Sequence, residues 1–436
     1  MAAGTGFGRR LAALMLGGFV LRVLYTLLVA DGIPVIGDAL TYHLQGANIA
    51  DGGGFTRVFH PQLELAQEDQ LGGAVELLGP TAEHPPLFSV LLAGLVKLGA
   101  DGYLAQKLVM CAVGTATVGL IGLVGREVGG ARVGLVAAGL AATYPFLWVI
   151  DGSLMSETPY AALIAAVLLA AVRLWRAPSL PLAAALGALV ALAALTRGEA
   201  ILLVPLLMLP LALRAAAPPR RRLALAAAGV GATVAVLAPW TIRNFTVFEE
   251  PVLISTNSNA VFVGSNCDPV YRGPFVGLWN FSCYGQAPRG DESEQAAEYR
   301  RRGLGYARDH AGRLPVVAAA RLGRVWDVYR PLQQVEYELF EGRSRWASRM
   351  GLAVYYPLLI LAAVGSVVLR RRRGALLPLL APLAMVSLTA LLVYGVTRFR
   401  VGAEPALVVL GAVGLDATLA RLWPRWSGEP VEQLGR

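Results

Sequence analysis

The sequence has little charge, three cysteines and only two lysines. Charged residues make up 15% of the 436 positions, whereas a typical soluble domain has about 25%. No G-x-x-x-x-G-K-[ST] phosphate loop and no G-x-S-x-G nucleophile elbow occur in the chain. Neither a Cys-x-x-Cys nor a His-x-x-x-His pair is present, which removes the usual zinc spacings. These absences argue against a soluble enzyme, a P-loop ATPase and a zinc protein.

Apolar residues dominate instead, and they form runs of membrane-spanning length. Hydrophobic residues make up 56% of the chain, and its mean hydropathy is +0.57. A run of about 17–20 apolar residues can cross a hydrocarbon core of ~30 Å. We therefore expect an all-α polytopic membrane protein, a bundle of about ten transmembrane helices or eleven. The predicted spans are 11–30, 104–124, 132–150, 158–174, 180–195, 199–213, 223–240, 350–369, 375–394 and 401–419.

The basic residues are almost all arginine, and they recur in alternate loops. Such clusters mark the cytoplasmic side of a membrane protein. The net charge of +9 therefore predicts a multi-pass orientation in the cell membrane, with both termini cytoplasmic, rather than nucleic-acid binding. The clusters are Arg9-Arg10, Arg126, Arg132, Arg173, Arg176, Arg214, Arg220-Arg221-Arg222 and Arg370 to Arg373.

The apolar stretch 86–100 does not fit this pattern easily. It is only about fifteen residues long, which is nearer to an interfacial or re-entrant segment than to a span. Counting it as a span would invert the following topology and place Arg126 and Arg132 outside. The positive-inside pattern therefore favours an interfacial segment, and the eleventh span stays open.

Two longer segments fall on the outer side of this topology, 31–85 and 241–348. We expect three regions: an N-terminal catalytic transmembrane module over 1–240, an extracytoplasmic segment over 241–348, and a C-terminal transmembrane module with a cytoplasmic tail over 349–436.

The outer segment 241–348 looks mixed in secondary structure. It has strand-like pieces at 251–255 and 260–264, followed by a helical pattern of acidic and basic residues over 291–330. Cys267 and Cys283 lie sixteen positions apart in it. In an oxidising compartment they could form a disulfide that contributes about 3 kcal/mol. The alternative is a pair of free buried thiols.

Asp38 is the most informative single residue. It lies eight positions after the first apolar run, with Tyr42 and His43 one helical turn further on. Glu83 and His84 return the chain to the membrane surface. An acid at the lipid–water boundary suits chemistry on a substrate whose tail lies in the bilayer. The alternative is a helix N-cap in a solvated loop, a position that Asp favours.

Other charged residues gather at the outer ends of the predicted spans. Arginine there departs from the positive-inside rule. Because guanidinium groups bind phosphate oxygens bidentately, this departure suggests an anionic ligand. The alternative is snorkelling of individual arginines to lipid headgroups. The residues are Asp151, Glu157, Arg197, Glu199, Arg243, Arg398 and Arg400. The histidines of the first outer loop, His43, His60 and His84, could join its carboxylates around a divalent metal.

These motifs, in this order, resemble those of the polyprenyl-phosphate-dependent GT-C glycosyltransferases. The similarity is to the branch with protein O-mannosyltransferases and lipid A aminoarabinose transferases (glycosyltransferase family 39-like), and it covers about 11–419. The motifs are Asp38 with Tyr42, His84-Pro-Pro-Leu, Ser156-Glu-Thr, Leu195-Thr-Arg-Gly-Glu, Pro239-Trp-Thr-Ile-Arg-Asn, and Arg398-Phe-Arg with Pro405.

The resemblance implies a donor sugar on a polyprenyl phosphate and transfer to an acceptor hydroxyl, with inversion, on the extracytoplasmic face. It implies that Asp38 is the general base and that Arg398 binds the donor phosphate, with Arg400 and Arg243 behind it. Tyr42, His43, Glu83, His84, Asp151, Glu157, Arg197 and Glu199 would contact or support the substrates. Two departures stand out: Ala39 follows Asp38 where many relatives have Glu, and the outer segment after the seventh span is short.

Two other classes of function compete with this interpretation. A flippase or transporter of a lipid-linked saccharide would use the same outer arginines, but it needs polar groups deep in several spans, and these spans have almost none. A structural envelope subunit would need only the Ala- and Gly-rich packing faces. The sugar, the prenyl length and the acceptor (glycan, lipid or protein) stay open.

Overall fold

The computed structural model describes residues 2–58 and 79–423, and these residues fold almost entirely into helices. The isolated antiparallel bridge between Thr56 and Pro80 is their only β-pairing. The main helices are α1 (Ala2–Leu28), α2 (Asp38–Ala50), α4 (Leu87–Lys97), α5 (Tyr103–Thr143), α6 (Pro145–Trp148), α7 (Glu157–Arg176), α8 (Leu180–Ala194), α9 (Leu209–Arg214), α10 (Pro219–Val247), α11 (Asn257–Ser265), α12 (Asp268–Tyr271), α13 (Glu292–Asp309), α14 (Leu314–Val325), α15 (Pro331–Glu338), α16 (Arg345–Arg371), α17 (Leu376–Leu392) and α18 (Glu404–Leu422).

Within the described residues, six helices are long and apolar enough to cross a membrane, namely α1, α5, α7, α10, α16 and α18. Three further apolar helices, α4, α8 and α17, are shorter. The chain is therefore an all-helical multi-pass membrane protein, as its composition predicts. Helix α4 has eleven residues and rises about 16 Å, which is too short for a ~30 Å core.

Helix α5 contains two of the predicted spans rather than one. Its backbone leaves the helical conformation at Gly130, where φ is +85°, a value that glycine adopts readily. A Cβ added at Gly125 would lie 3.0 Å from the Cα of Gly134, so the two arms run side by side. The predicted spans 104–124 and 132–150 are thus the arms of a close helical hairpin.

The predicted span over 199–213 is not a continuous α-helix. It is divided into a 3₁₀ segment η3 (Gly198–Leu202), a π-helical segment η4 (Val204–Met208) and α9. Pro205 lies in the π-helical segment, and its missing N–H removes one α-helical hydrogen bond there. The apolar run was recognised correctly, but its regular helical form was wrong.

The outer segment is helical where strands were expected. Residues 260–264 lie in α11, and 251–255 form an irregular turn, so both strand predictions were wrong. Helix α11 crosses α13 so closely that a Cβ at Gly303 would lie 2.2 Å from the Phe262 carbonyl oxygen. This packing overrides the β-propensity of Val261 and Val263.

The helical pattern predicted over 291–330 is confirmed by α13 and α14. Helix α13 begins at a capping box, in which the Asp291 carboxylate accepts from the Ser293 and Glu294 backbone N–H groups. The Glu294 side chain in turn accepts from the Asp291 N–H. Cys267 and Cys283 are joined by a disulfide, with their Cα atoms 6.2 Å apart.

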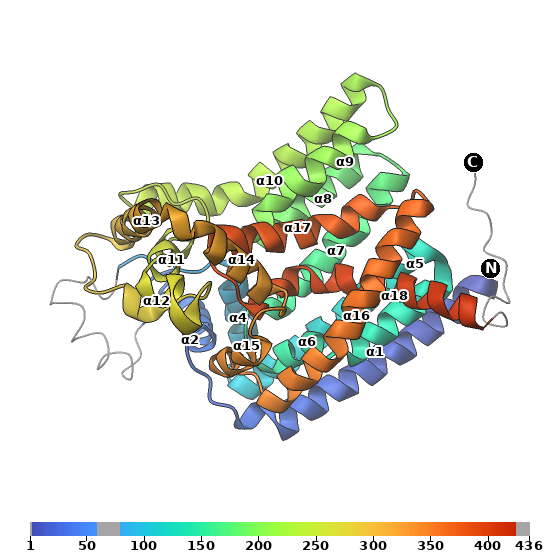
Figure 1. The fold of residues 1–436 in the computed structure, drawn as a ribbon, viewed down its shortest axis with the longest axis horizontal. Helices are drawn as coiled ribbons and strands as arrows, with labels where there is room; N and C mark the ends of the chain where they lie inside the picture. The colour runs from blue at the N-terminus through green and yellow to red at the C-terminus, as the bar shows by residue number, and fades with distance from the viewer. Residues whose placement is uncertain (1, 59–78, 424–436) are drawn as a thin grey trace.

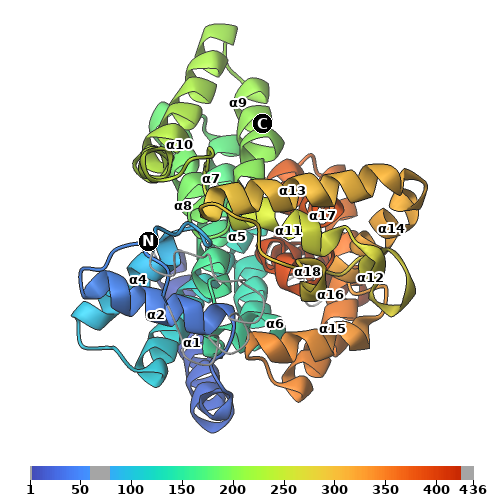
Figure 2. The same cartoon turned by 90° about the vertical axis from the view of Figure 1, so that its left-hand side faces the viewer.

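The helices form a bundle with an elaborated end. Helices α1, α5, α16 and α18 run alongside one another, and α2 and α11–α14 gather at one end (Figure 1). The beginning of α1 and the end of α18 lie at the opposite end. Viewed from the elaborated end, α2 and α4 lie on one side and α11–α15 on the other (Figure 2). The candidate site lies where these two sides meet.

Candidate active site

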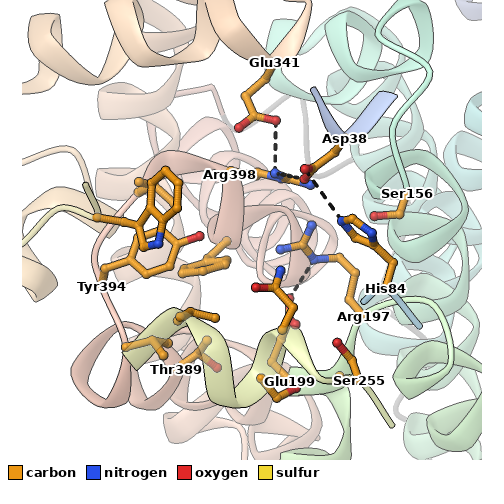
Figure 3. Close-up of a pocket in the computed structure, with 18 of the residues that line it drawn as sticks. Asp38, His84, Ser156, Arg197, Glu199, Ser255, Glu341, Thr389, Tyr394 and Arg398 are labelled. Atoms are coloured by element: carbon orange, nitrogen blue, oxygen red, sulfur yellow. Dashed lines mark hydrogen bonds and ion pairs between the residues drawn. The ribbon is translucent and has the colours of Figure 1, made fainter. Parts of the chain in front are cut away.

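A cavity of about 560 Å³ opens at this end of the bundle, within the size range of small-ligand sites. Its wall is made by α2, the loop before α4, the 196–199 turn after α8, α11, α15, and the 3₁₀ segment η9 (Thr397–Gly402). Its charged and polar side chains point toward one another in Figure 3. Residues from the N-terminal and the C-terminal parts of the chain therefore build one site.

Arg398 lies at the centre of the charged network. Its Nη1 donates to Asp38 Oδ2 at 2.7 Å and pairs with Glu341 Oε2 at 3.0 Å (Figure 3). Its Nε donates to Glu157 Oε1. The Arg398 side chain is only 13% exposed, and the Glu157 side chain is fully buried. One guanidinium thus holds three carboxylates from distant parts of the chain.

Asp38 is the most accessible member of this network, with a 37% exposed side chain. It is the first residue of α2; the N-cap position belongs to Gly37, which has a φ of +58°. The structure therefore does not use Asp38 as an N-cap, and its carboxylate faces Arg398 and His84 instead. Burial alone would raise the Asp38 pKa, but Arg398 and His84 hold that pKa well below its usual range.

His84 lies beside Asp38, with 3.6 Å between His84 Nε2 and Asp38 Oδ1. Burial opposes the charged imidazole, but the carboxylates of Asp38 and Glu83 outweigh it, and the His84 pKa is raised above its ordinary value. The ring also packs on Tyr42, at 4.7 Å between centroids. The Tyr42 hydroxyl lies 3.3 Å from Ser156 Oγ, which ties α2 to the start of α7.

Arg197 forms a second bridge below the first. Its Nη1 donates to Glu157 Oε1 at 3.0 Å, and its Nε donates to Glu199 Oε1 at 2.7 Å. Glu157 is therefore shared by Arg197 and Arg398. The motifs Ser156-Glu-Thr, Leu195-Thr-Arg-Gly-Glu and Arg398-Phe-Arg, which are far apart in sequence, meet at this one buried carboxylate.

Arg400 does not line the cavity, contrary to its expected place at the donor phosphate. Its side chain is completely buried and pairs with Asp327 and Glu404. The guanidinium also lies 3.7 Å from the centroid of the Tyr355 ring. These partners satisfy the Arg400 charge away from the cavity, so its placement does not support phosphate binding.

Arg243 is also engaged elsewhere. Its guanidinium donates to the carbonyl oxygens of Phe55 and Thr81, at 2.8 and 3.0 Å, and packs against Trp240. It therefore fastens the first outer loop to the end of α10 and does not line the cavity. The position beside Thr81 places Arg243 behind Glu83 and His84, as a support for their loop.

Two other predicted residues lie apart from the cavity. Asp151 is fully buried and pairs with Arg22 of α1 at 2.7 Å. His43 forms a 2.9 Å hydrogen bond with Gln106 and packs on Tyr103. Asp151 therefore joins the segment after α6 to α1, and His43 joins α2 to the beginning of α5. His60 lies outside the described residues.

The structure adds cavity residues that the sequence motifs did not indicate. Glu341 pairs with Arg398, although it lies in the turn before α16. Ser156, Tyr394 and Trp279 also line the cavity. Ser156 lies in the Ser156-Glu-Thr motif, which was singled out for Glu157 alone, and Tyr394 lies four residues before Arg398, so both were close to a recognised residue. Glu341 and Trp279 had no local signal.

The arrangement does not suit the divalent metal considered from sequence. Among residues 2–58 and 79–423, no three His, Cys, Asp or Glu side chains are placed to hold a metal ion together. Asp38, Glu157 and Glu341 come close, but the Arg398 guanidinium lies between them. These three carboxylates are therefore paired with Arg398 rather than left free to bind a metal ion.

Comparison with known sequences supports the resemblance seen in the motifs. Residues 83–242 match the model of the dolichyl-phosphate-mannose-protein mannosyltransferase family. The matched region includes Glu83, His84, Glu157, Arg197 and Glu199, whereas Asp38 and Arg398 lie outside it. No curated protein matches the chain in sequence.

Solved structures share the fold over nearly the whole chain. The archaeal oligosaccharyltransferase AglB from Archaeoglobus fulgidus, in complex with an inhibitory peptide and a dolichol-phosphate, has a TM-score of 0.55 and 12% identity, over 96% of this chain and 51% of that one. The Archaeoglobus fulgidus oligosaccharyltransferase tethered to an acceptor peptide gives 0.52 and 12%, over 97% and 51%. This chain thus spans about half the length of these enzymes. It has the GT-C fold, and the resemblance to the GT-C glycosyltransferases that the motifs indicated is confirmed.

Proposed function

We propose that the protein is a membrane glycosyltransferase that moves a hexosyl or pentosyl group from a polyprenyl-phosphate donor to an acceptor hydroxyl. The family match and the fold support a glycosyltransferase that uses a lipid-phosphate donor. The observation that carries the proposal is the Arg398 guanidinium in the cavity wall, which bonds Asp38 in the cavity and is held from behind by the fully buried Glu157. A base and a phosphate-binding cation are thereby in direct contact.

The donor phosphate takes the place of the Asp38 carboxylate on Arg398. Guanidinium binds phosphate through two parallel hydrogen bonds, and Arg398 Nη1 faces the most exposed carboxylate of the network. Glu157 keeps hold of the Arg398 Nε during this exchange, so the guanidinium stays in position. The apolar wall that includes Leu392 and Val393 suits the first isoprenoid units.

Donor binding also activates the base. In the free protein, Arg398 and His84 hold the Asp38 pKa below its usual range, so its carboxylate is a weak base. When the phosphate replaces Asp38 as the partner of Arg398 Nη1, the Asp38 pKa rises and the carboxylate can accept the acceptor's hydroxyl proton. The acceptor oxygen then attacks the anomeric carbon in line, with inversion. The bond to the phosphate oxygen breaks, and the polyprenyl phosphate leaves with that electron pair, stabilised by Arg398.

The proposal places the site on the extracytoplasmic face of the cell membrane and both termini in the cytoplasm. The arginine clusters at the beginnings of α1 and α10 and at the end of α16 lie at the end of the bundle away from α2 and α11–α14 (Figure 1). Clustered arginine favours the cytoplasmic side. The disulfide lies at the other end, in agreement with an oxidising compartment.

Transfer from radiolabelled polyprenyl-phosphate sugars to membrane acceptors tests the proposal directly. We expect the purified protein, reconstituted in lipid, to turn over at least one hexose or pentose donor. Asp38→Asn should lower the rate of transfer about 10²–10⁴-fold and keep donor binding, whereas Asp51→Asn, at the exposed end of the same helix, should change neither. If no donor is turned over but a labelled lipid-linked saccharide crosses the vesicle bilayer, the protein is a flippase and the proposal fails.

A further inference from the structure

Trp279 lines the same cavity as Asp38 and Arg398 but has no part in the charged network. It comes from the outer segment between α12 and α13, whereas the charged residues come from the bundle. The indole is half-buried, so part of its surface faces the cavity. The cavity therefore offers a ligand a half-buried aromatic face as well as the charged side chains of Asp38 and Arg398.

The structure fixes the orientation of this ring closely. A Cβ at Gly264 of α11 would lie 2.2 Å from Trp279 Nε1, so only glycine allows the indole to rest there. Trp279 Nε1 donates to the Tyr284 hydroxyl at 3.2 Å. The next residue, Asn280, donates its backbone N–H to the Gly264 carbonyl at 2.9 Å. The disulfide between Cys267 and Cys283 closes the same loop.

Two polar side chains accompany the ring on the cavity wall. Asn257 and Ser258, in the first turn of α11, line the cavity. Neither side chain makes a hydrogen bond to another of the residues that the structure describes. Their amide and hydroxyl groups are therefore available to a ligand. A fixed aromatic face beside free amide and hydroxyl groups matches the two kinds of surface on a sugar ring, its C–H face and its hydroxyls.

We propose that Trp279 is a carbohydrate-stacking residue, and that Asn257 and Ser258 bind hydroxyls of the ring packed on it. This inference rests on the proposed function, because it names the group that occupies the cavity beside Asp38. The electron-rich face of an indole attracts the weakly positive C–H face of a sugar. The ring is either the sugar of the donor or the terminal sugar of a glycan acceptor, and the two sources differ in experiment.

The test compares Trp279→Ala with Trp279→Phe, which keeps an aromatic face. Leu253→Ala is the control, since Leu253 lies shortly before α11, is 66% exposed and does not line the cavity. Gly264→Ala is a second, independent variant, because its new Cβ must displace the indole. Each variant is first checked for an unchanged thermal unfolding temperature.

Binding of two lipids and the kinetics of two reactions distinguish a donor sugar on Trp279 from an acceptor sugar. For a donor ring, Trp279→Ala and Gly264→Ala should weaken binding of a polyprenyl-phosphate sugar about tenfold and leave binding of bare polyprenyl phosphate unchanged. For an acceptor ring, donor binding and donor hydrolysis by water should stay normal, while KM for the membrane acceptor rises about tenfold. Trp279→Phe should restore most of the loss in either case.

The inference is overturned if stable Trp279→Ala changes none of these quantities, if bare polyprenyl phosphate is affected equally, or if Leu253→Ala has the same effect. Failure of the proposed function looks different, because the wild-type protein would then bind neither lipid. In that case binding of mannotriose to the wild type is measured. Its loss in Trp279→Ala keeps the stacking site, and its absence in the wild type removes both proposals.

Discussion

Arg398 donates to Asp38 at 2.7 Å, although 360 positions separate the two residues in the chain. The contact links the first helix after α1 to the segment just before α18. It also sets the resting state of the site, because the base and the cation neutralise each other until a ligand separates them. The first two predictions follow from this pairing.

Asp38→Asn should lower the rate of sugar transfer about 10²–10⁴-fold, since the amide cannot take the acceptor proton. Donor affinity should stay the same or increase, because the neutral amide no longer competes with phosphate for Arg398. Transfer and donor binding are measured side by side, with Asp51→Asn as the control. Wild-type transfer by Asp38→Asn would show that Asp38 serves only as a partner of Arg398.

Arg398→Lys keeps the charge but loses the planar group that reaches Asp38, Glu157 and Glu341 together. We expect KM for the donor to rise and kcat to fall, with a combined loss of about 10²–10³. Steady-state kinetics with one donor measures both constants. Arg349→Lys, an exposed arginine of α16, is the matched control. Equal kinetics for Arg398→Lys and wild type would remove Arg398 from the phosphate site.

We expect the activity and stability of the site to fall at alkaline pH, because His84 then loses its positive charge. Its folded pKa is raised above the ordinary 6.5, chiefly by Asp38 acting against burial. The stability contributed by His84 is therefore fully present below about pH 6.5 and is lost as pH rises through the folded pKa. We expect kcat/KM for the donor to fall over the same range, because a positive charge beside the phosphate is lost.

The pH dependence is checked with His84→Asn, which cannot titrate. Its kcat/KM should lack the inflection above pH 6.5 that the wild type shows. An acidic limb due to Asp38 should lie well below pH 4 in the free protein, since the Asp38 pKa is depressed. If the inflection survives in His84→Asn, another group causes it.

Arg400→Met should act on stability rather than on donor binding. The substitution leaves the buried carboxylates of Asp327 and Glu404 without their shared cation, which costs about 3–5 kcal/mol. Thermal unfolding in detergent measures the loss. A variant with wild-type stability but weak donor binding would return Arg400 to the phosphate-binding role that its motif suggests.

Much of the fold was predictable because its signals are local. Apolar runs of membrane length predicted α1, α7, α10, α16 and α18, and the pattern of acidic and basic residues over 291–330 predicted α13 and α14. Asp38, Glu157 and Arg197 were recognisable because charged residues at the ends of apolar runs are few. Their mutual distance was not predictable, since it depends on how helices from opposite ends of the chain pack.

Arg398 and Arg400 show where the sequence becomes insufficient. They are two positions apart in one motif, and nothing local distinguishes them. Their different surroundings come from Asp327 and Glu404, which pair with Arg400 and leave Arg398 to the cavity. The strand predictions at 251–255 and 260–264 failed for a related reason, since the contact with α13 decides the form of α11.

The distance along the chain between Glu157 and Arg398 also sets a time order during synthesis. Glu157 is made 241 residues before the arginine that bonds its Oε1. At 5–20 residues per second, that interval lasts roughly 10–50 s. Two arginines, Arg197 and Arg398, pair with Glu157 in the folded protein. During this interval only Arg197 has been synthesised. A nascent chain that has not yet reached Arg398 therefore lacks the cation that we propose binds the donor phosphate.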